Sequence, residues 1–131
     1  MSYQASISDI EKNYLDPSKP SVVGNGQCVA FVVKVATKLT TSHWKKGKLV
    51  AGDVGIPAGT AIATFDPNGQ YGNHLDGRSH AAIYVSQNPD SLTVYDQWVG
   101  QPVHKRAIRM KHAKGAKVSA VNDGTQYHVI E

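Results

Sequence analysis

Three side chains in this sequence are of the types that nucleophilic attack on a carbonyl carbon requires. Cys28 is the single cysteine, His80 follows after a long interval, and Asp96 comes later still. Such an attack needs a partly ionised thiol, a base within hydrogen-bonding reach and donors for the oxyanion that develops. The set predicts Cys28 as the nucleophile, His80 as its base and Asp96 as the group that orients the base.

A lone cysteine forms no internal disulfide, and it excludes a four-cysteine zinc site. Taken alone, it is more often a small buried hydrophobe than a nucleophile. The neighbours favour the nucleophile, because Gly24, Asn25 and Gly26 form a turn before Cys28 and the apolar run CVAFVVKVATKLT follows. We expect a largely buried helix that begins at or just before Cys28. Its free amides and dipole would lower the thiol pKa and bind an oxyanion, with the Gln27 side chain as a second donor.

The base lies at the start of an apolar segment. His80 is followed by the apolar run AAIYV at 81–85, which predicts a strand. The small Ala81 and Ala82 would let the preceding helix pack closely on the sheet. On the next strand, Asp96 can accept the second ring proton of the imidazole and set its tautomer. Gln97 competes for this role, because adjacent strand residues point to opposite faces and only one can face His80. We favour Asp96, since a carboxylate also stabilises the imidazolium, and leave Gln97 as a candidate for the groove.

The remaining pattern predicts an α+β domain in which N-terminal helices pack on an antiparallel sheet. A first helix spans 8–15, with Ser8 as its N-cap and Glu11 in the capping-box position. The 131 residues fit one compact domain, 1–131. Apolar and β-branched segments predict strands at 48–50, 60–65, 80–86, 91–98, 103–110 and 127–130, with a turn at 87–90 joining the third strand to the fourth.

Three ordered segments carry a resemblance to a known family. The segment GQC at 26–28 opens an apolar helix, HAAIYV at 80–85 begins a strand, and VYDQW at 94–98 follows. The set resembles the papain-like NlpC/P60 and CHAP peptidoglycan hydrolases, in which a cysteine at a helix start faces a histidine at a strand start. It is most similar to the second group of type VI secretion amidase effectors, through GTAIATF at 59–65, the Gly- and Tyr-containing loop and Arg106.

The resemblance implies a cysteine peptidase or amidase that cuts a stem-peptide amide of peptidoglycan, such as the diaminopimelate–D-alanine cross-link. It also implies an antibacterial role and a periplasmic immunity protein that plugs the groove. The N-terminal segment MSYQASISDIEKNYLD lacks the features of a secretory signal. We therefore expect synthesis in the cytoplasm and injection into the periplasm of a rival cell. Release of a phage lysis endopeptidase through a holin fits equally well.

The loop before His80 supplies candidates for a substrate groove. Tyr71, Asn73 and His74 lie in it, and Trp98 either walls the groove or belongs to the core. A metal shared by His74 and His80 lacks a third ligand with suitable spacing, so we expect no metal and no cofactor. Trp44 and the other histidines (His43, His104, His112 and His128) are expected to be core, packing or surface residues.

The net charge of +4 favours anionic partners without choosing among them. Six basic residues between 105 and 117 occur with no acid between them, which usually marks a solvated face but would also suit an anionic wall or an acidic immunity protein. Two alternatives to an enzyme are a wall-peptide- or protein-binding domain of the same fold and a nucleic-acid binder. The second ranks last, because aromatic residues do not interleave with the basic ones. No apolar run is long enough to predict membrane insertion.

Overall fold

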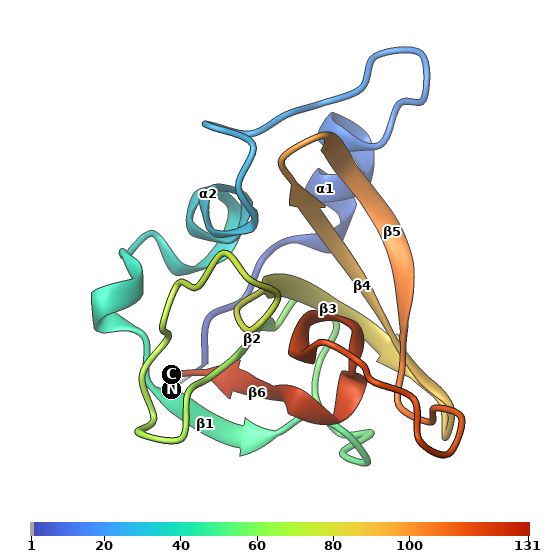
Figure 1. Cartoon of the computed structure of the whole chain (residues 1–131). Coiled ribbons are helices and arrows are strands. Elements are labelled where there is room, and N and C mark those ends of the chain that lie inside the picture. Colours follow the sequence, from blue (N-terminus) through green and yellow to red (C-terminus); the bar gives the residue numbers. More distant parts are fainter. Residues whose placement is uncertain (1) are drawn as a thin grey trace.

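The structure, a computed structural model, describes residues 2–131, so Met1, the first residue of the expected domain, lies outside the described residues. Helices α1 and α2 lie on one side of a six-stranded antiparallel sheet with the strand order β1-β6-β2-β3-β4-β5 (Figure 1). The expected α+β class is thus confirmed. The elements are α1 (Ile7–Tyr14), α2 (Cys28–Val32), β1 (Lys46–Leu49), β2 (Ala61–Thr64), β3 (Ala81–Gln87), β4 (Ser91–Trp98), β5 (Gln101–Arg109) and β6 (Tyr127–Ile130).

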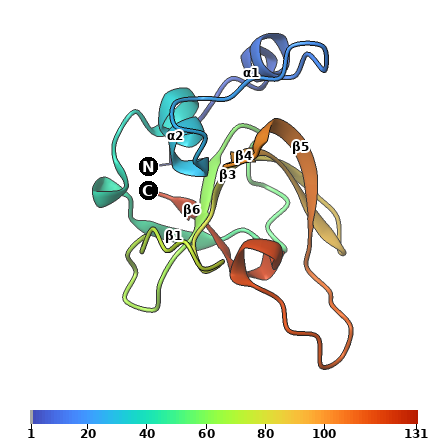
Figure 2. The same ribbon diagram turned by 45° about the horizontal axis from the view of Figure 1, so that its top comes forward.

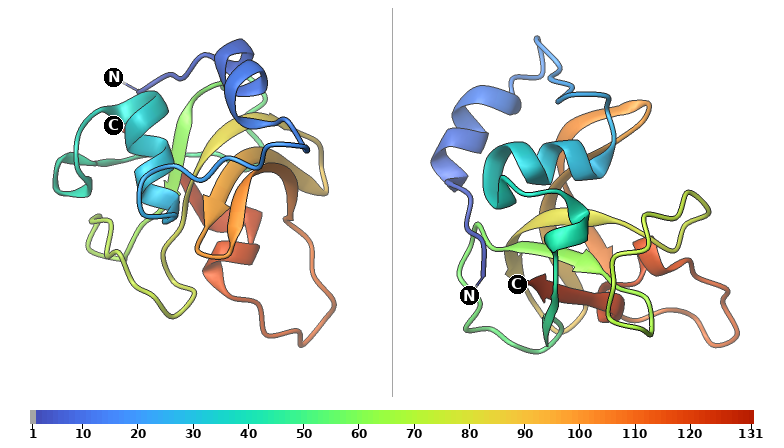
Figure 3. Two further views of the ribbon diagram at one scale, coloured as in Figure 1. Left: turned by 90° about the horizontal axis from the view of Figure 1, so that it is seen from above. Right: turned by 90° about the vertical axis from the view of Figure 1, so that its left-hand side faces the viewer.

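The central strands are buried on both faces, and their side chains divide between two apolar clusters. The first cluster lies between the helices and the sheet and includes Ile10 of α1, Phe31 of α2 and Tyr95 of β4. The second cluster lies on the opposite face, where Val94 and Tyr127 are among its fully buried members. Figures 2 and 3 show both helices on the side of the first cluster.

Small residues of the sheet let α2 approach it closely. Ala63 of β2 and Ala81 of β3 are register partners, and both belong to the cluster that includes Phe31. Ala82 was also expected to face the helix, but it points to the other cluster and does not contribute to this contact. The alternation of a strand makes two adjacent alanines unable to serve one face. The alanine from the neighbouring strand takes the place of the second.

Helix α1 begins at Ile7, one residue before the expected start at 8. Ser6, with extended backbone angles (φ −85°, ψ 113°), is the N-cap, and its hydroxyl accepts a hydrogen bond from the amide of Asp9 at 3.3 Å. The prediction of Ser8 as the N-cap was therefore wrong. Glu11 forms no capping box, because its carboxylate accepts a hydrogen bond from the Tyr95 hydroxyl at 2.8 Å. A tertiary contact with β4 replaces the local contact that the sequence suggested.

Helix α2 begins at Cys28, as the sequence predicted. Gly26 precedes it with φ +86°, a conformation that favours glycine and lets the chain turn into the helix. The α-helix ends after Val32 and continues as a π-helical turn over Val33–Thr37. Lys38 then adopts a left-handed conformation (φ 58°), so the longer helix expected through 40 ends there.

All six expected strands form; 91–98 and 127–130 have the bounds of β4 and β6, and the other four have shifted ends. The first strand begins earlier than expected, at Lys46 rather than 48. His80 lies just before β3, where its amide donates to Thr64 Oγ1 at 3.0 Å and its carbonyl accepts from the Thr64 amide at 3.0 Å. The histidine therefore sits at the end of the strand pair and leaves its ring directed out of the ladder.

Two loops extend from the sheet. The segment 65–80 joins β2 to β3, and the segment 110–126, with short 3₁₀ turns, joins β5 to β6 (Figure 3). The exposed part of the second loop, 111–117, carries three of the six basic residues noted above. Among residues 2–131, no helix has the length and apolar character that crossing a bilayer would take.

Candidate active site

The sulfur of Cys28 and the imidazole of His80 are neighbours, although one lies on α2 and the other before β3. The Cys28 side chain lies close enough to His80 and to the backbone N–H of Ala81 for both to lower the thiol pKa. Its Sγ also lies 3.7 Å from the hydroxyl oxygen of Tyr71. The meeting of thiol and imidazole, on which the sequence interpretation depends, is thus present in the fold.

His80 is held on its other side by a carboxylate. Its Nε2 lies 2.7 Å from Oδ2 of Asp96, and the two residues are 5% and 0% exposed. Because Nε2 engages Asp96, Nδ1 is the ring nitrogen left for the Cys28 thiol. Asp96, rather than Gln97, is therefore the β4 residue that faces the imidazole.

The surroundings favour the charged forms of both Cys28 and His80. Burial acts to raise the pKa of the Cys28 thiol, but the hydrogen bond and charge of His80, with the Ala81 amide and the Tyr71 hydroxyl, outweigh it and lower that pKa. Burial likewise acts to lower the pKa of His80, but Asp96 and Cys28 raise it to about 9. The surroundings thus favour the thiolate of Cys28 and the imidazolium of His80 over the neutral forms.

Asp96 has two further partners, both on β5. Arg106 Nε donates to the same Oδ2 at 2.7 Å. His104 Nε2 lies 3.1 Å from Oδ1, an ion-pair distance at which the geometry makes no hydrogen bond, and Oδ1 has no hydrogen-bond donor among the described residues. Burial acts to raise the pKa of Asp96, but His80 and then Arg106 lower it overall. A buried carboxylate is retained as an anion because cationic groups surround it.

Trp98, at the end of β4, covers these polar groups. Its ring is edge-on to His104 at 5.0 Å and to His80 at 6.3 Å between ring centroids. The guanidinium of Arg106 lies 5.1 Å from the Trp98 ring centroid, in a cation–π contact. Trp98 is 41% exposed, so one part packs on the charge network and another part faces solvent.

A cleft of about 570 Å³ opens over the thiol and the imidazole. Its size suits a short peptide segment rather than a flat macromolecular surface. Residues from α2, the 65–80 loop, β4, β5 and the 110–126 loop contribute to it. They are Gln27, Cys28, His74, Leu75, Gly77, Ser79, His80, Trp98, Val99, Arg106, Val121 and Asn122.

Comparison with known proteins agrees with this geometry. Residues 4–130 match the family described as "Domesticated amidase effector 2". The chain belongs to this amidase effector family. A relative from Salmonella typhi, "Type VI secretion amidase effector 2 protein", is 36% identical over 119 residues, 83% of this chain and 88% of the relative.

Two other relatives of this amidase effector 2 family have the same kind of name. "Domesticated amidase effector 2" of Ixodes scapularis is 41% identical over 92 residues, which cover 66% of this chain and 61% of the relative. A solved structure, "Type 6 secretion amidase effector 2", superposes with a TM-score of 0.73 at 34% identity, over 86% of this chain and 87% of the other. The likeness therefore covers both sequence and fold.

In this amidase effector 2 family member, two of the residues predicted to bind the oxyanion or line the groove lie next to Cys28. Gln27 lines the cleft, and it directly precedes the first helical residue, whose amide is among those that a helix leaves without intrahelical acceptors. Tyr71 lies beneath the thiol and is only 8% exposed. Its hydroxyl pKa is raised by burial and then by Cys28, so it stays a neutral donor to the sulfur.

Gln97 lies outside the cleft and is fully buried. Its side-chain oxygen accepts from the amide of Val23 at 2.9 Å, and its side-chain nitrogen donates to the carbonyls of Val23 and Gln27 at 2.8 Å each. The amide thus ties the segment before α2 to β4. We infer that Gln97 positions Cys28 from behind and does not contact substrate.

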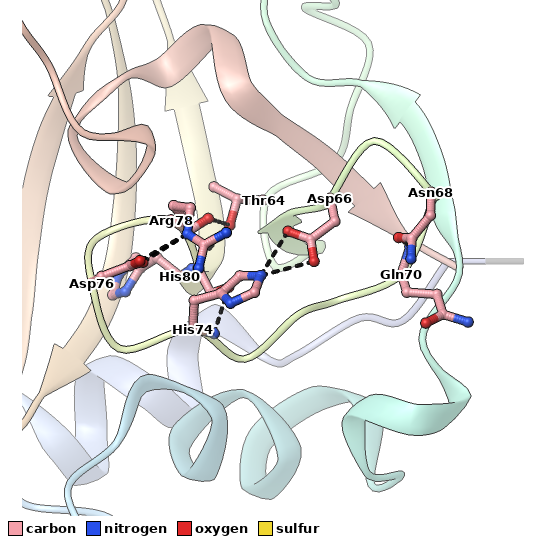
Figure 4. Close-up of polar contacts among 9 residues, drawn as sticks. Thr64, Asp66, Asn68, Gln70, His74, Asp76, Arg78 and His80 are labelled. Carbon is pink, nitrogen blue, oxygen red and sulfur yellow. Dashed lines mark hydrogen bonds and ion pairs between the residues drawn. The ribbon is translucent and has the colours of Figure 1, made fainter.

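The loop before His80 is held by its own polar contacts (Figure 4). His74 Nε2 lies 2.9 Å from Asp66 Oδ2, and the His74 amide donates to Ser79 Oγ at 2.8 Å. Gly72 permits this pair, because a Cβ there would lie 2.2 Å from both Asp66 Oδ2 and His74 Nε2. His74 therefore pairs with a carboxylate within its loop while lining the cleft.

Arg106 and His104 are the site residues that sequence reasoning missed. Arg106 entered as part of a family resemblance and as one of the six basic residues at 105–117, and His104 was assigned to the surface or to packing. Their signal was present in the alternation of β5, because residues two positions apart on a strand, such as His104 and Arg106, point to the same face. It became readable only with the register, which pairs Asp96 with His104 and Val94 with Arg106.

Proposed function

We propose that this protein is a cysteine amidase that hydrolyses peptide amide bonds of bacterial peptidoglycan and acts as an antibacterial effector. One observation carries the proposal: in a chain of an amidase effector family, the Cys28 thiol contacts His80, whose other nitrogen lies 2.7 Å from Asp96. Nucleophile, base and orienting carboxylate are the complete set for acyl transfer to sulfur. The named relatives are amidase effectors, which supports the same reaction class here.

In the proposed reaction, the Cys28 thiolate attacks the amide carbonyl and forms a bond from sulfur to carbon. Amides of the first turn of α2 and the side chain of Gln27 stabilise the oxyanion. His80, as imidazolium, gives its proton to the nitrogen that leaves, and the carbon–nitrogen bond breaks. Water then gives a proton to His80 and attacks the thioester carbonyl, and the carbon–sulfur bond breaks. The carboxylic acid leaves, and Cys28 returns to the thiolate beside the imidazolium of His80.

We place the chain, as the finer family assignment, among the papain-like NlpC/P60 and CHAP hydrolases, with residues 1–131 as one hydrolase domain. The order of cysteine on a helix, histidine at a strand start and a polar residue on the next strand supports this assignment. Within that group, the expected bond is a stem-peptide amide, such as the diaminopimelate–D-alanine cross-link.

The proposed route is delivery by a type VI secretion system into the periplasm of a rival cell. The relative from Salmonella typhi carries type VI secretion in its name, which supports this route over release through a phage holin. A cell that makes such an enzyme needs protection from the same enzyme when a neighbouring sister cell injects it. We therefore also propose a periplasmic immunity protein that covers the cleft.

The decisive experiment compares digestion of purified sacculi by wild type, Cys28→Ala and His80→Ala, with mass spectrometry of the released fragments. His43→Ala is a matched control for His80→Ala, since His43 is exposed and lies outside the cleft. We expect fragments from wild type and His43→Ala only, and the cut position names the bond. Equal digestion by Cys28→Ala would show that the chain does not use this thiol.

Iodoacetamide labelling separates an activated thiol from a binding domain of the same fold. We expect Cys28 to be alkylated faster at pH 7 in wild type than in His80→Ala, because His80 stabilises the thiolate. Equal alkylation rates in the two proteins would contradict the activated pair. A binding domain predicts retained sacculus binding and no released fragments in every variant.

A further inference from the structure

A second hollow, of about 930 Å³, adjoins the cleft. It lies over the outer side of α2, between the segment before that helix and the loop 65–80, which runs alongside α2 (Figure 4). Gln27 and Leu75 line both hollows, so the two meet next to the thiol. The lining residues are Tyr14, Val22, Val23, Gly24, Asn25, Gln27, Val29, Ala30, Val33, Lys34, Asn73 and Leu75.

Exposed apolar side chains gather around these two hollows. The structure has seven large apolar residues that are well exposed within 2–131, and four of them (Val22, Leu75, Trp98 and Val99) line one or both hollows. Leu75, at their junction, is 85% exposed. Such clustering is typical of a surface that a ligand covers, because scattered apolar residues would show no preference for one groove.

The charges of the lining are of one sign. No aspartate or glutamate is among the described residues that line either hollow. Nearby acids are turned away or paired: Asp96 is fully buried, and Asp66 binds His74. Lys34 is the charged residue of the second hollow, and no ion pair joins it to a carboxylate within the described part of the chain. A groove of this kind attracts a ligand with carboxylates.

We propose that the second hollow binds the peptide arm on the far side of the scissile amide, and that Lys34 pairs with a free carboxylate of this arm. The inference rests on the proposed function, since it assumes that the scissile carbonyl lies at Cys28. A cross-linked stem peptide extends in both directions from that carbonyl. One arm then occupies the cleft beneath Trp98, and the other crosses Gln27 and lies along α2.

Distances along the chain agree with this arrangement. Lys34 follows Cys28 by six residues and lies in the π-helical turn that continues α2. At the α-helical rise of about 1.5 Å per residue, this separation is at most roughly 9 Å along the helix axis. An extended peptide covers that length in about three residues at roughly 3.3 Å each. Lys34 therefore lies opposite the second or third residue from the cut. Stem peptides carry carboxylates at such positions, on D-glutamate and on diaminopimelate, and some bacteria amidate them.

The test measures kinetics on two defined cross-linked muropeptide dimers, one with free and one with amidated carboxylates on the stem peptide. Lys34→Met keeps the apolar stem and removes the charge, and Lys12→Met on α1, exposed and outside both hollows, is its matched control. For the free-carboxylate dimer we expect Lys34→Met to raise KM about fivefold, as loss of a largely exposed ion pair does, with kcat within about twofold. For the amidated dimer we expect the KM of Lys34→Met to equal that of wild type.

Equal KM values for Lys34→Met and Lys12→Met on the free-carboxylate dimer would overturn the proposal, as would the same rise on both dimers. A binding titration of Cys28→Ser with the two muropeptides, followed by backbone NMR, does not depend on cleavage. We expect shifts at residues 22–25 and 29–34, with tighter binding of the free-carboxylate form. Shifts confined to the cleft would reject the second hollow, whereas absence of cleavage by wild type would reject only the proposed reaction.

Discussion

His80 Nε2 and Asp96 Oδ2 lie 2.7 Å apart in a part of the molecule that is almost closed to solvent. Asp96→Asn removes the charge and keeps the shape, so the imidazolium loses its main partner. We expect kcat to fall on the order of 100-fold or more with little change in KM. An NMR titration of His80 should show its pKa falling from about 9 toward its ordinary value of 6.5. An unchanged His80 pKa in this variant would refute the assigned role of Asp96.

The pH dependence of the reaction follows from the two shifted groups. The lowered pKa of Cys28 means that the acidic limb of the profile, where activity rises as the thiol ionises, lies below the ordinary thiol value of 9.0. The raised pKa of His80 means that the proton donor is lost as the pH passes about 9. We expect a bell-shaped profile of kcat/KM with its basic limb near pH 9. A profile that still rises at pH 10 would show that imidazolium is not required.

Arg106 and His80 share one carboxylate oxygen, because Arg106 Nε and His80 Nε2 each lie 2.7 Å from Asp96 Oδ2. We expect Arg106→Gln to lower kcat about tenfold or more, because Asp96 loses a charged donor and Trp98 loses its stacked guanidinium. Arg109→Gln on the same strand is exposed and serves as the control. Arg106→Lys restores the charge without the planar group, so it should recover part of kcat. Equal kcat for Arg106→Gln and Arg109→Gln would remove Arg106 from the site.

Gln97 satisfies three backbone groups before α2 while fully buried. Gln97→Met keeps the volume but leaves these groups without partners, each costing about 1–3 kcal/mol. We expect the free energy of unfolding in urea to fall by about 3 kcal/mol, with slower alkylation of Cys28 at pH 7. Gln126→Met, at an exposed position, should change neither quantity by a comparable amount. A stability equal to that of Gln126→Met would show that the tie is not needed.

Gly72 lies against the side chains of Asp66 and His74. These two side chains pair with each other (Figure 4). A methyl group at this position forces the pair apart, so Gly72→Ala should release the 65–80 loop. We expect faster limited proteolysis within this loop and a KM raised about threefold, with kcat nearly unchanged because His80 is anchored separately by Thr64. His74→Gln should have a similar effect on proteolysis. A loss of kcat without faster proteolysis would point to a direct role of the loop in the reaction.

Much of the fold could be predicted because its signals are local. The apolar run after Gly26 marks the helix at Cys28, and the strand ends at 91–98 and 127–130 follow from alternation and turn residues. Predictions that relied on one residue were weaker. Ser6 and Ser8 are equivalent by type, and only the backbone angles of Ser6 decide which one caps α1.

The sequence by itself determined the chemical set: one thiol, a histidine at a strand start and an aspartate on the next strand. Tertiary structure decided what surrounds each group. Strand register brings Arg106 and His104 to Asp96, a buried Gln97 ties Cys28 to β4, and Tyr71 reaches the sulfur from a distant loop. The reason is that a residue's type is written in the chain, whereas its pKa and its partners depend on which distant segments pack against it.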